Sequence, residues 1–423
     1  MATLPSTDDG GRIVTLDIIR GVAVMGIFSV NVIAFAMIEA AYFNPAAYGG
    51  HNGADLALWA ANMVLVDGKM RTLFSMLFGA SMLLVIERAE ASGRSGWWTH
   101  FRRMIVLLGF GLFHYYFIWF GDILTLYAIS GLIAFLFRRM APEKLVALGI
   151  TLLLANMVLL AGFLYTQYQA DIAAHAPGAT QKAIEEWNDG LGQMYPSAAA
   201  IAKDKALHLG GYAQFVGHKL SNWDDIVGNT LPFIPDTVGL MLLGMAGYKS
   251  GFLTGQWSDS RYRRIAFPAI AAGALAGAAV VAYDIGSSFY IVGMMTAFIV
   301  AETPFITLMA VGYAALIILM SRGVGPLTQR LAAAGRCAFT NYLGTSLLAT
   351  FVFYGWGLGY YDSFSRWQAW LLAPVIWSVM LLWSKPWLDR FHYGPFEWAW
   401  RSLSRGKLQP MRKRSDVAAV AAA

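Results

Sequence analysis

The chain has 423 residues, of which 57% are hydrophobic and 13% are charged. Soluble globular domains carry about 25% charged residues, so this composition excludes an ordinary water-soluble fold and points to a lipid environment. The formal net charge of +6 would suggest nucleic acid in a soluble protein. In a membrane protein an excess of Lys and Arg in cytoplasmic loops explains it, and we expect the lipid bilayer rather than nucleic acid as partner.

Apolar stretches of roughly 20 residues, the length that a helix needs to cross the hydrocarbon core, recur along the chain. We therefore expect an all-α, polytopic membrane bundle with about ten transmembrane helices. They are predicted at 18–38, 70–87, 103–120, 122–137, 143–165, 229–249, 265–283, 289–320, 335–357 and 367–384.

Two segments do not fit a simple span. The apolar piece from Leu56 to Val66 is too short to cross, and we expect an interfacial or re-entrant helix that leads into the second span. The stretch from Phe289 to Met320 has Pro304 near its middle, so it is either one long kinked helix or two short crossings. Two crossings would move the basic tail to the outside, so the charge rule favours one span.

Basic residues concentrate in alternate loops. They are Arg88, Arg94, Arg102 and Arg103; Arg138, Arg139 and Lys144; Lys249, Arg261, Arg263 and Arg264; Arg322, Arg330 and Arg336; and, in the tail, Arg401, Arg405, Lys407, Arg412, Lys413 and Arg414. The positive-inside rule places these loops and both termini in the cytoplasm, with the chain as a multi-pass protein of a bacterial inner membrane.

The predicted organisation has five parts. They are a five-helix transmembrane part (1–165), an external polar segment with short amphipathic helices (166–228), central transmembrane helices (229–334), a C-terminal transmembrane region (335–407) and a basic cytoplasmic tail that we expect to be disordered (408–423).

Charged residues inside the spans are the first candidates for function, because each costs about 2.5–3.5 kcal/mol at mid-membrane unless it is paired or faces a cavity. Asp17 and Arg20 are three residues apart on one helical face, so they either pair with each other or offer Arg20 to a phosphate from the cytoplasm. Lys69 and Arg71 stand at the outer end of the second span. They either snorkel to the interface, or Arg71 contacts an anion in an external vestibule.

His114 is the best titratable candidate in the chain, since an imidazole pKa of about 6.5 suits acid–base catalysis. The alternative is a hydrogen-bonded packing histidine. Asp122 follows eight residues later, about 12 Å along a continuous helix, so the two side chains meet only if the chain turns back at Gly121. Otherwise Asp122 faces the same cavity from above.

Acids next to prolines form a third group. Asp236 follows Pro232 and Pro235, and Glu302 is close to Pro304. Such pairs are typical of broken helices that line a cavity, although a simple kink is favoured for Glu302. The seven histidines show no HExxH spacing, and neither a Walker motif nor GxSxG occurs, so no metal site is expected.

Four motifs follow one another along the chain. They are Leu16-Asp17-Ile18-Ile19-Arg20-Gly21 with Asn31; Leu73-Phe74-Ser75-Met76-Leu77-Phe78-Gly79; Gly111, His114 and Gly121-Asp122-Ile123-Leu124; and Gly335-Arg336, Thr340-Asn341-Tyr342-Leu343 and Gly394-Pro395-Phe396-Glu397-Trp398. In this order and spacing they resemble the YeiB family of the transmembrane acyltransferase clan. The region from Gly335 onward resembles its C-terminal domain, DUF418.

The resemblance implies a membrane acyltransferase that takes acyl-CoA, such as acetyl-CoA, from the cytoplasm and acylates a sugar or other small acceptor in or beyond the membrane. No covalently bound cofactor is expected. Many clan members use a histidine in the first span, whereas this chain has Asn31 at the comparable point, so that histidine is not carried over. We expect His114 as base, Asn31 as donor to the oxyanion and Asp122 as the third catalytic residue.

Inner arginines would then hold the CoA phosphates, because guanidinium binds phosphate in a bidentate way. The candidate substrate- and CoA-binding residues are Asp17, Arg20, Arg71, Arg102, Arg103, Arg336 and Asn341. Two other classes stay open: a transporter of a small metabolite with broken helices near Pro235 and Pro304, and a non-catalytic membrane scaffold. A homodimer is also left open.

Overall fold

The computed structural model describes residues 13–323 and 325–413. The longer helices are α1 (Val14–Ala36), α4 (Lys69–Ala91), α5 (Gly96–Phe117), α7 (Pro142–His175), α12 (Ile234–Lys249), α13 (Asp259–Gly286), α15 (Thr303–Met320), α17 (Ala338–Phe353) and α19 (Leu372–Arg390). The shorter α-helices are α2 (Glu39–Phe43), α3 (Gly53–Leu65), α6 (Leu124–Ala134), α8 (Gln181–Asp189), α9 (Ala198–Leu209), α10 (Tyr212–Ser221), α11 (Asp225–Thr230), α14 (Ile291–Thr296), α16 (Pro326–Arg336), α18 (Arg366–Trp370) and α20 (Pro395–Arg405). Three short 3₁₀ helices are η1 (Phe135–Phe137), η2 (Leu191–Met194) and η3 (Leu231–Phe233), and η4 (Ala297–Glu302) is a π-helix.

Seven helical segments of the described chain are long and apolar enough to cross a membrane. They are Val14–Ala36, Gly53–Ala91, Pro142–His175, Asp225–Lys249, Asp259–Gly286, Ile291–Met320 and Arg366–Arg390. These segments contain seven of the ten predicted spans, and the other three correspond to α5, to the shorter apolar helix Leu124–Phe137 and to α17. The predicted fold class, a helical membrane bundle, is confirmed.

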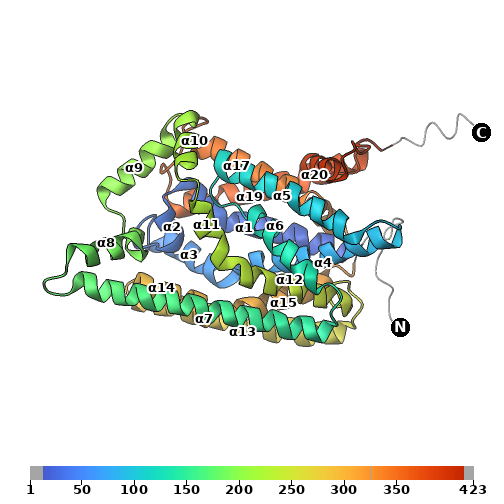
Figure 1. The fold of residues 1–423 in the computed structure, drawn as a ribbon, viewed down its shortest axis with the longest axis horizontal. Helices are drawn as coiled ribbons and strands as arrows, with labels where there is room; N and C mark the ends of the chain where they lie inside the picture. Colours follow the sequence, from blue (N-terminus) through green and yellow to red (C-terminus); the bar gives the residue numbers. More distant parts are fainter. Residues whose placement is uncertain (1–12, 324, 414–423) are drawn as a thin grey trace, which may run out of the picture.

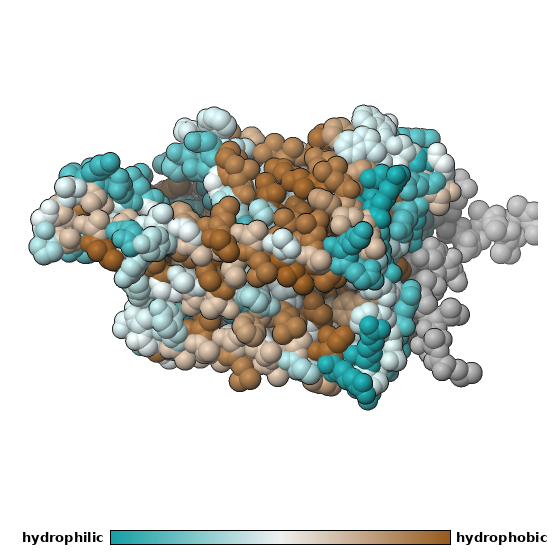
Figure 2. All heavy atoms as spheres, turned by 60° about the horizontal axis from the view of Figure 1, so that its bottom comes forward, coloured by the Kyte–Doolittle hydropathy of each residue, from teal (hydrophilic) through white to brown (hydrophobic). Residues whose placement is uncertain are grey.

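The outer surface has the character that lipid requires. Figure 2 shows one face on which hydrophobic residues form a broad band between hydrophilic ends. On α7 the exposed side chains are large and apolar, among them Ile150, Val158 and Phe163. Water would not tolerate such a helix at the surface of a monomer, so these residues face the hydrocarbon.

The polar segment folds as a helical cap, as expected from its aromatic residues. Helices α8, α9 and α10 gather at one end of the molecule, and α20 lies at the other (Figure 1). Trp187 and Phe215 anchor the cap because both rings are buried. The span predicted at 143–165 was too short: α7 has 34 residues, about 51 Å, and continues from the bilayer into the cap.

Helix α1 lies at the centre of the bundle and packs against α4, α16 and α17. Glycines set how closely these helices approach. A Cβ at Gly335 of α16 would collide with the Asp17 carbonyl oxygen of α1, and one at Gly21 would collide with the Leu331 carbonyl. Small residues are the usual means by which membrane helices come close, so this crossing is specified by sequence.

The two irregular segments have clear backbone causes. The stretch around Pro304 is one helical segment, Ile291–Met320, in which the π-helix η4 precedes the proline. Proline lacks an N–H and its ring clashes with the carbonyl four residues earlier, and the wider π-turn accommodates both effects. Helix α3 packs against α13 and leads directly into α4 through Gly68, whose φ of +71° suits glycine.

The prediction of a disordered tail from 408 was wrong for residues 408–413. Trp398 Nε1 donates to the Gln409 carbonyl at 2.8 Å, and His392 N donates to the Met411 carbonyl at 2.9 Å. Lys413 N donates to the Arg390 carbonyl at 3.0 Å. These bonds hold the segment against the turn between α19 and α20. Residues 414–423, including Arg414, lie outside the described residues.

We predict that Gly244→Ala lowers the midpoint of thermal unfolding in detergent. Gly244 of α12 packs on the Met76 carbonyl of α4, so a methyl group forces the two helices apart and costs about 1–3 kcal/mol. Gly162→Ala on α7 is the matched control, since a Cβ there meets nothing within 4 Å. Equal unfolding midpoints for the two variants would refute the close α4–α12 crossing.

Candidate functional site

The described residues enclose a cavity of about 390 Å³ between α1, α4, α7, the start of α12 and the η4–α15 helix. Its polar and charged lining residues are Asn31, Glu39, Tyr42, Asp67, Arg71, Thr72, Asp122, Asn156, Asn229, Asp236, Thr303, Thr307 and Tyr342. On α1 the lining runs from Ile27 to Ala34, the half that follows the cytoplasmic start of the helix. With the orientation given by the charge rule, the cavity lies in the outer half of the bundle.

The turn between α5 and α6 brings His114 and Asp122 together. Helix α5 ends at Phe117, four residues before Gly121, and the chain then reverses. His114 Nδ1 lies 3.0 Å from Asp122 Oδ1, and the other carboxylate oxygen accepts from Thr125 N at 2.8 Å. The second bond satisfies a free N–H at the start of α6, so the helix end itself holds the acid in place.

Asp122 belongs to the cavity wall, although its side chain is only 1% exposed, and His114 lies outside that wall. Asp122 is among the lining residues, whereas the His114 ring is completely buried and is not. His114 packs edge-on against Trp119 and contacts the Tyr342 ring at 5.3 Å between centroids. Sequence reasoning assigned the base to His114 and placed Asp122 at the same cavity; the structure brings the two together, with Asp122 in the cavity wall.

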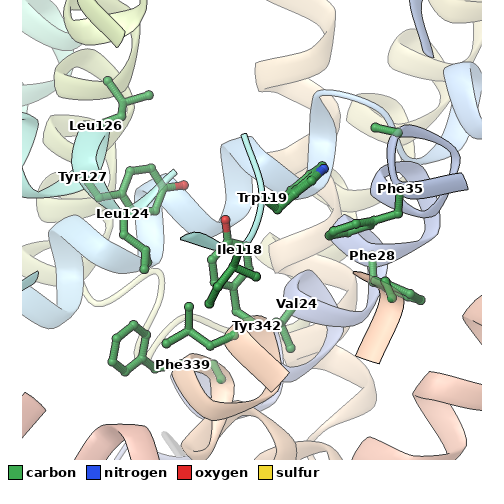
Figure 3. Packing of buried hydrophobic residues seen from close by; sticks show 14 of the residues in the cluster. Val24, Phe28, Phe35, Ile118, Trp119, Leu124, Leu126, Tyr127, Phe339 and Tyr342 are labelled. Carbon is green, nitrogen blue, oxygen red and sulfur yellow. The ribbon is translucent and has the colours of Figure 1, made fainter. Parts of the chain in front are cut away.

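Tyr342 of α17 fixes the turn from the other half of the chain. Its hydroxyl donates to the Gly121 carbonyl at 3.2 Å and accepts from Ile123 N at 3.3 Å. On the other side of the turn, Trp119 stacks on Phe35 of α1 with 4.0 Å between ring centroids (Figure 3). The cavity wall around Asp122 is therefore held by aromatic residues from α1 and α17.

A second charged pair forms part of the cavity wall. Arg71 Nη1 lies 2.8 Å from Asp236 Oδ2, and both residues line the cavity. This corresponds to the predicted external position of Arg71, but its charge is balanced by an acid on α12. Lys69 does not snorkel: it is fully buried and bonds to Glu302 Oε1 at 2.5 Å.

The remaining predicted binding residues lie away from the cavity. Arg20 Nη1 bonds to Asp17 Oδ1 at 2.8 Å, and its Nη2 bonds to Ser81 Oγ at 2.6 Å. Asn341 is held inside the C-terminal region, where it donates to the Ala334 carbonyl at 3.0 Å and accepts from Trp383 Nε1 at 3.0 Å.

Arg102 and Arg103 stand where α5 meets α20. The Arg103 guanidinium lies 4.1 Å from the Trp400 ring centroid, and Arg102 contacts Gly406. Arg336 is the last residue of α16. Three of the predicted site residues (Asn31, Arg71 and Asp122) therefore line the cavity, and the CoA-binding roles of the inner arginines stay predictions.

Several lining residues were missed by sequence reasoning. Asn156 could have been predicted, because a polar amide within the apolar span 143–165 is expected to face a partner or a cavity. Glu39 and Asp67 were not singled out, since in sequence they appear as ordinary loop acids. Enclosure by the surrounding chain raises the pKa of Glu39 above its usual range, an effect that nearby Lys219 of the cap partly offsets.

A helical membrane bundle with a polar cavity is the class of protein that these features define. Residues 247–407 match the model of a family described as a protein of unknown function (DUF418). The chain is 33% identical to YeiB of Escherichia coli K12 over 414 residues, which covers 93% of this chain and 96% of the relative. It is 30% identical to YxaH of Bacillus subtilis 168 over 427 residues, which covers 99% and 100%.

A 39.9 kDa protein in the amylase 3' region of Bacillus acidopullulyticus is 25% identical over 412 residues. No solved structure matches the chain. The protein belongs to the YeiB family, as its motifs predicted. The DUF418 match begins at residue 247, well before Gly335, so the family-defining region includes α13, α15 and α16 as well as α17 to α20.

We predict that Tyr342→Phe loosens the turn that carries Asp122. Loss of the hydroxyl leaves the Ile123 amide and the Gly121 carbonyl without this partner, at a cost of about 1–3 kcal/mol. Hydrogen–deuterium exchange should rise in residues 118–123. Tyr360→Phe, at a ring that is 45% exposed, serves as control. Unchanged exchange at Ile123 would contradict the role assigned to Tyr342.

Proposed function

We propose that this protein is a membrane acyltransferase that moves an acyl group from cytoplasmic acyl-CoA to a hydroxyl or amine acceptor bound in the outer cavity. One observation carries the proposal: Asp122 lines the cavity, and its carboxylate, in a side chain that is 1% exposed, lies 3.0 Å from the buried imidazole of His114. A carboxylate that a histidine orients at a cavity wall is suited to accept a proton from a bound nucleophile.

The chemistry is balanced with the groups present. Asp122 takes the proton from the acceptor, whose oxygen or nitrogen attacks the thioester carbonyl and forms the new C–O or C–N bond. The C–S bond breaks, and the proton leaves on the CoA thiol. Asn31 lines the same cavity from α1, where its amide N–H can donate to the carbonyl oxygen as negative charge develops. His114 acts through Asp122 and is a positioning residue.

The donor must reach this point from the inner side. Arg20 and Asn31 are eleven residues apart on α1, about 16 Å along the helix axis. A CoA whose phosphates contact the inner arginines would therefore have to extend its pantetheine arm along α1 to bring the thioester to Asn31. This requirement favours a narrow passage beside α1 as the donor route.

We predict that Asp122→Asn lowers acyl transfer about 10²- to 10⁴-fold, because the amide cannot accept the proton. His114→Gln should lower it less than His114→Ala does, since glutamine can still donate to Asp122. The assay uses purified protein, radiolabelled acetyl-CoA and a panel of sugars, amino sugars and alcohols. Asp189→Asn, on the exposed face of α8, is the control. Absence of transfer or hydrolysis with every acceptor, together with no CoA binding by calorimetry, would remove the proposal.

Transport of a small metabolite is the second candidate function. Its support is the interrupted helix at the cavity, because η4 and Thr303 of α15 bring irregular backbone beside the Arg71–Asp236 pair. Such helices often border the solute site of transporters. Solute flux in proteoliposomes that persists in Asp122→Asn would favour transport over acyl transfer.

A further inference from the structure

A second cluster of charged residues lies beside the cavity, at the junction of α4, η4 and α13. Lys69 is 0% exposed, and Glu302 and Asp284 are each 1% exposed. Lys69 Nζ bonds to Glu302 Oε1 at 2.5 Å and to the Met63 carbonyl at 2.6 Å. The acyl-transfer proposal uses none of these groups.

The carboxylates outnumber the cations available to them. Asp67, two residues before Lys69, accepts from Gly68 N and Tyr42, so Lys69 stands between two acids, Asp67 and Glu302. Arg71 is engaged by Asp236. The cluster itself consists of Lys69 and the acids Asp67, Asp284 and Glu302. If all four were ionised, their net charge would be −2 inside the bundle, which is strongly unfavourable without compensating partners.

In the described part of the chain, two carboxylate oxygens of this cluster have no hydrogen-bond donor to stabilise a negative charge. Glu302 Oε2 and Asp284 Oδ1 are buried and have no hydrogen-bond partner among the described residues. An ionised carboxylate needs donors on its oxygens, and leaving one without them in a buried site carries the full desolvation penalty. A proton on Asp284 removes its charge, whereas Glu302 is compensated by Lys69 and would take up a proton when that bond opens.

Among the described residues, Lys69 is the one cation that forms an ion pair with Glu302 or Asp284. The titratable or charged groups on the elements packed against η4 and α13 near these acids are Lys69 and Asp67 at the start of α4, Tyr283 on α13, Tyr290 before α14 and Tyr313 on α15. The Tyr290 hydroxyl bonds to Asp171, and the Tyr313 hydroxyl bonds to the Leu65 carbonyl. The α7 residues at the cavity, Asn156 and Met157, do not titrate.

We propose that Glu302 and Asp284 form a proton-binding site that exchanges protons between the outer solution and the cavity. Asp284 lies two residues from the outer end of α13. Glu302 adjoins Thr303, and Lys69 follows Gly68, and both of these neighbours line the cavity. The path therefore has Asp284 on its outer side and the Glu302–Lys69 pair at the cavity wall.

Both residues of the Lys69–Glu302 pair are in or next to irregular backbone. Glu302 ends the π-helix η4, and Lys69 follows Gly68 in its left-handed conformation. Short π segments are frequent at functional sites, where their backbone can return to α-helical geometry. Such a shift would separate Glu302 from Lys69 and change the affinity of the carboxyl group for a proton. The site thus links proton binding to the shape of the cavity wall.

This site adds a property beyond acyl transfer. Transfer from a thioester to an alcohol or amine consumes no proton overall, because the proton removed from the acceptor leaves on the thiol. A buried proton site beside the cavity is instead suited to drive the movement of a solute or acceptor through that cavity. The inference does not depend on the acyltransferase proposal.

The test is infrared spectroscopy of the purified protein across a pH titration in H₂O and D₂O. We expect the carbonyl band of a protonated carboxyl group at neutral pH that is lost in Asp284→Asn, and a second band at lower pH that is lost in Glu302→Gln. The exposed positions Glu186→Gln and Asp189→Asn should leave both bands unchanged. Absence of both bands in the native protein overturns the proposal. If thermal stabilisation by Na⁺ over K⁺ accompanies that absence, the ligand is a metal cation instead.

Removing one member of a buried ion pair can prevent folding, so Lys69→Met combined with Glu302→Gln is measured beside the single variants. In the double variant the Asp284 band should remain. In proteoliposomes an external acid pulse should acidify the lumen at least tenfold more slowly with Asp284→Asn than with native protein. Equal rates in the two preparations would exclude Asp284 from the path.

Discussion

The structure depends on one constraint: an ionised group inside a membrane bundle must find a partner on another segment or be neutralised. Lys69 meets Glu302 across 233 residues of sequence, and Arg71 meets Asp236 on α12. These two pairs tie the start of α4 to two later helices and so shape the wall of the cavity. The same constraint explains why irregular backbone is found there, since the pairs and the cavity shield it from lipid.

The two halves of the chain build the site together. Asp122 and His114 come from the α5–α6 turn, whereas the hydroxyl that holds this turn comes from Tyr342 of α17. The relatives from Escherichia coli and Bacillus subtilis align over 93% and 99% of this chain. Alignment over almost the whole length fits a site that neither half can form alone.

The sequence predicted what depends on local pattern. Apolar length predicted the spans, and the three-residue spacing of Asp17 and Arg20 on one helical face allowed their ion pair. Partners from different helices were not predicted, because the pairing of Lys69 with Glu302 depends on how each helix is rotated in the bundle. Periodicity carries no information on such rotation when a helix is apolar on all sides, as α4 and α15 nearly are.

The candidate site was predicted in part for the same reason. A polar residue in an apolar span reveals that a cavity or partner exists, and Asn31 and Asp122 do line a cavity. Which member of the His114–Asp122 pair faces the cavity depends on the turn after Phe117, and no sequence pattern specified that turn. The ordered segment 408–413 was missed because its hydrogen bonds go to backbone atoms near Arg390 and His392.

A packed apolar layer separates the cavity from the inner arginines. It contains Ile19 and Ala23 of α1, Leu77 and Ala80 of α4, and Ala314 of α15, each at most 1% exposed. Neither an acyl-CoA arm nor a solute can pass this layer as it stands, so both candidate functions require a second arrangement of these helices. Alanine side chains are small, so helices can shift against each other here without rearranging large side chains. This contact is therefore where we expect the passage to open.

The width of that opening separates the two functions physically. An extended pantetheine arm needs only a slot beside α1, whereas a solute that fills a cavity of about 390 Å³ needs the α1, α4 and α15 faces to part completely. For α1 to separate completely from α4 and α15, it must either break its close Gly21–Leu331 and Gly335–Asp17 contacts with α16 or move together with α16. The tight α1–α16 crossing therefore favours a narrow passage, and with it transfer of a group over release of a whole molecule.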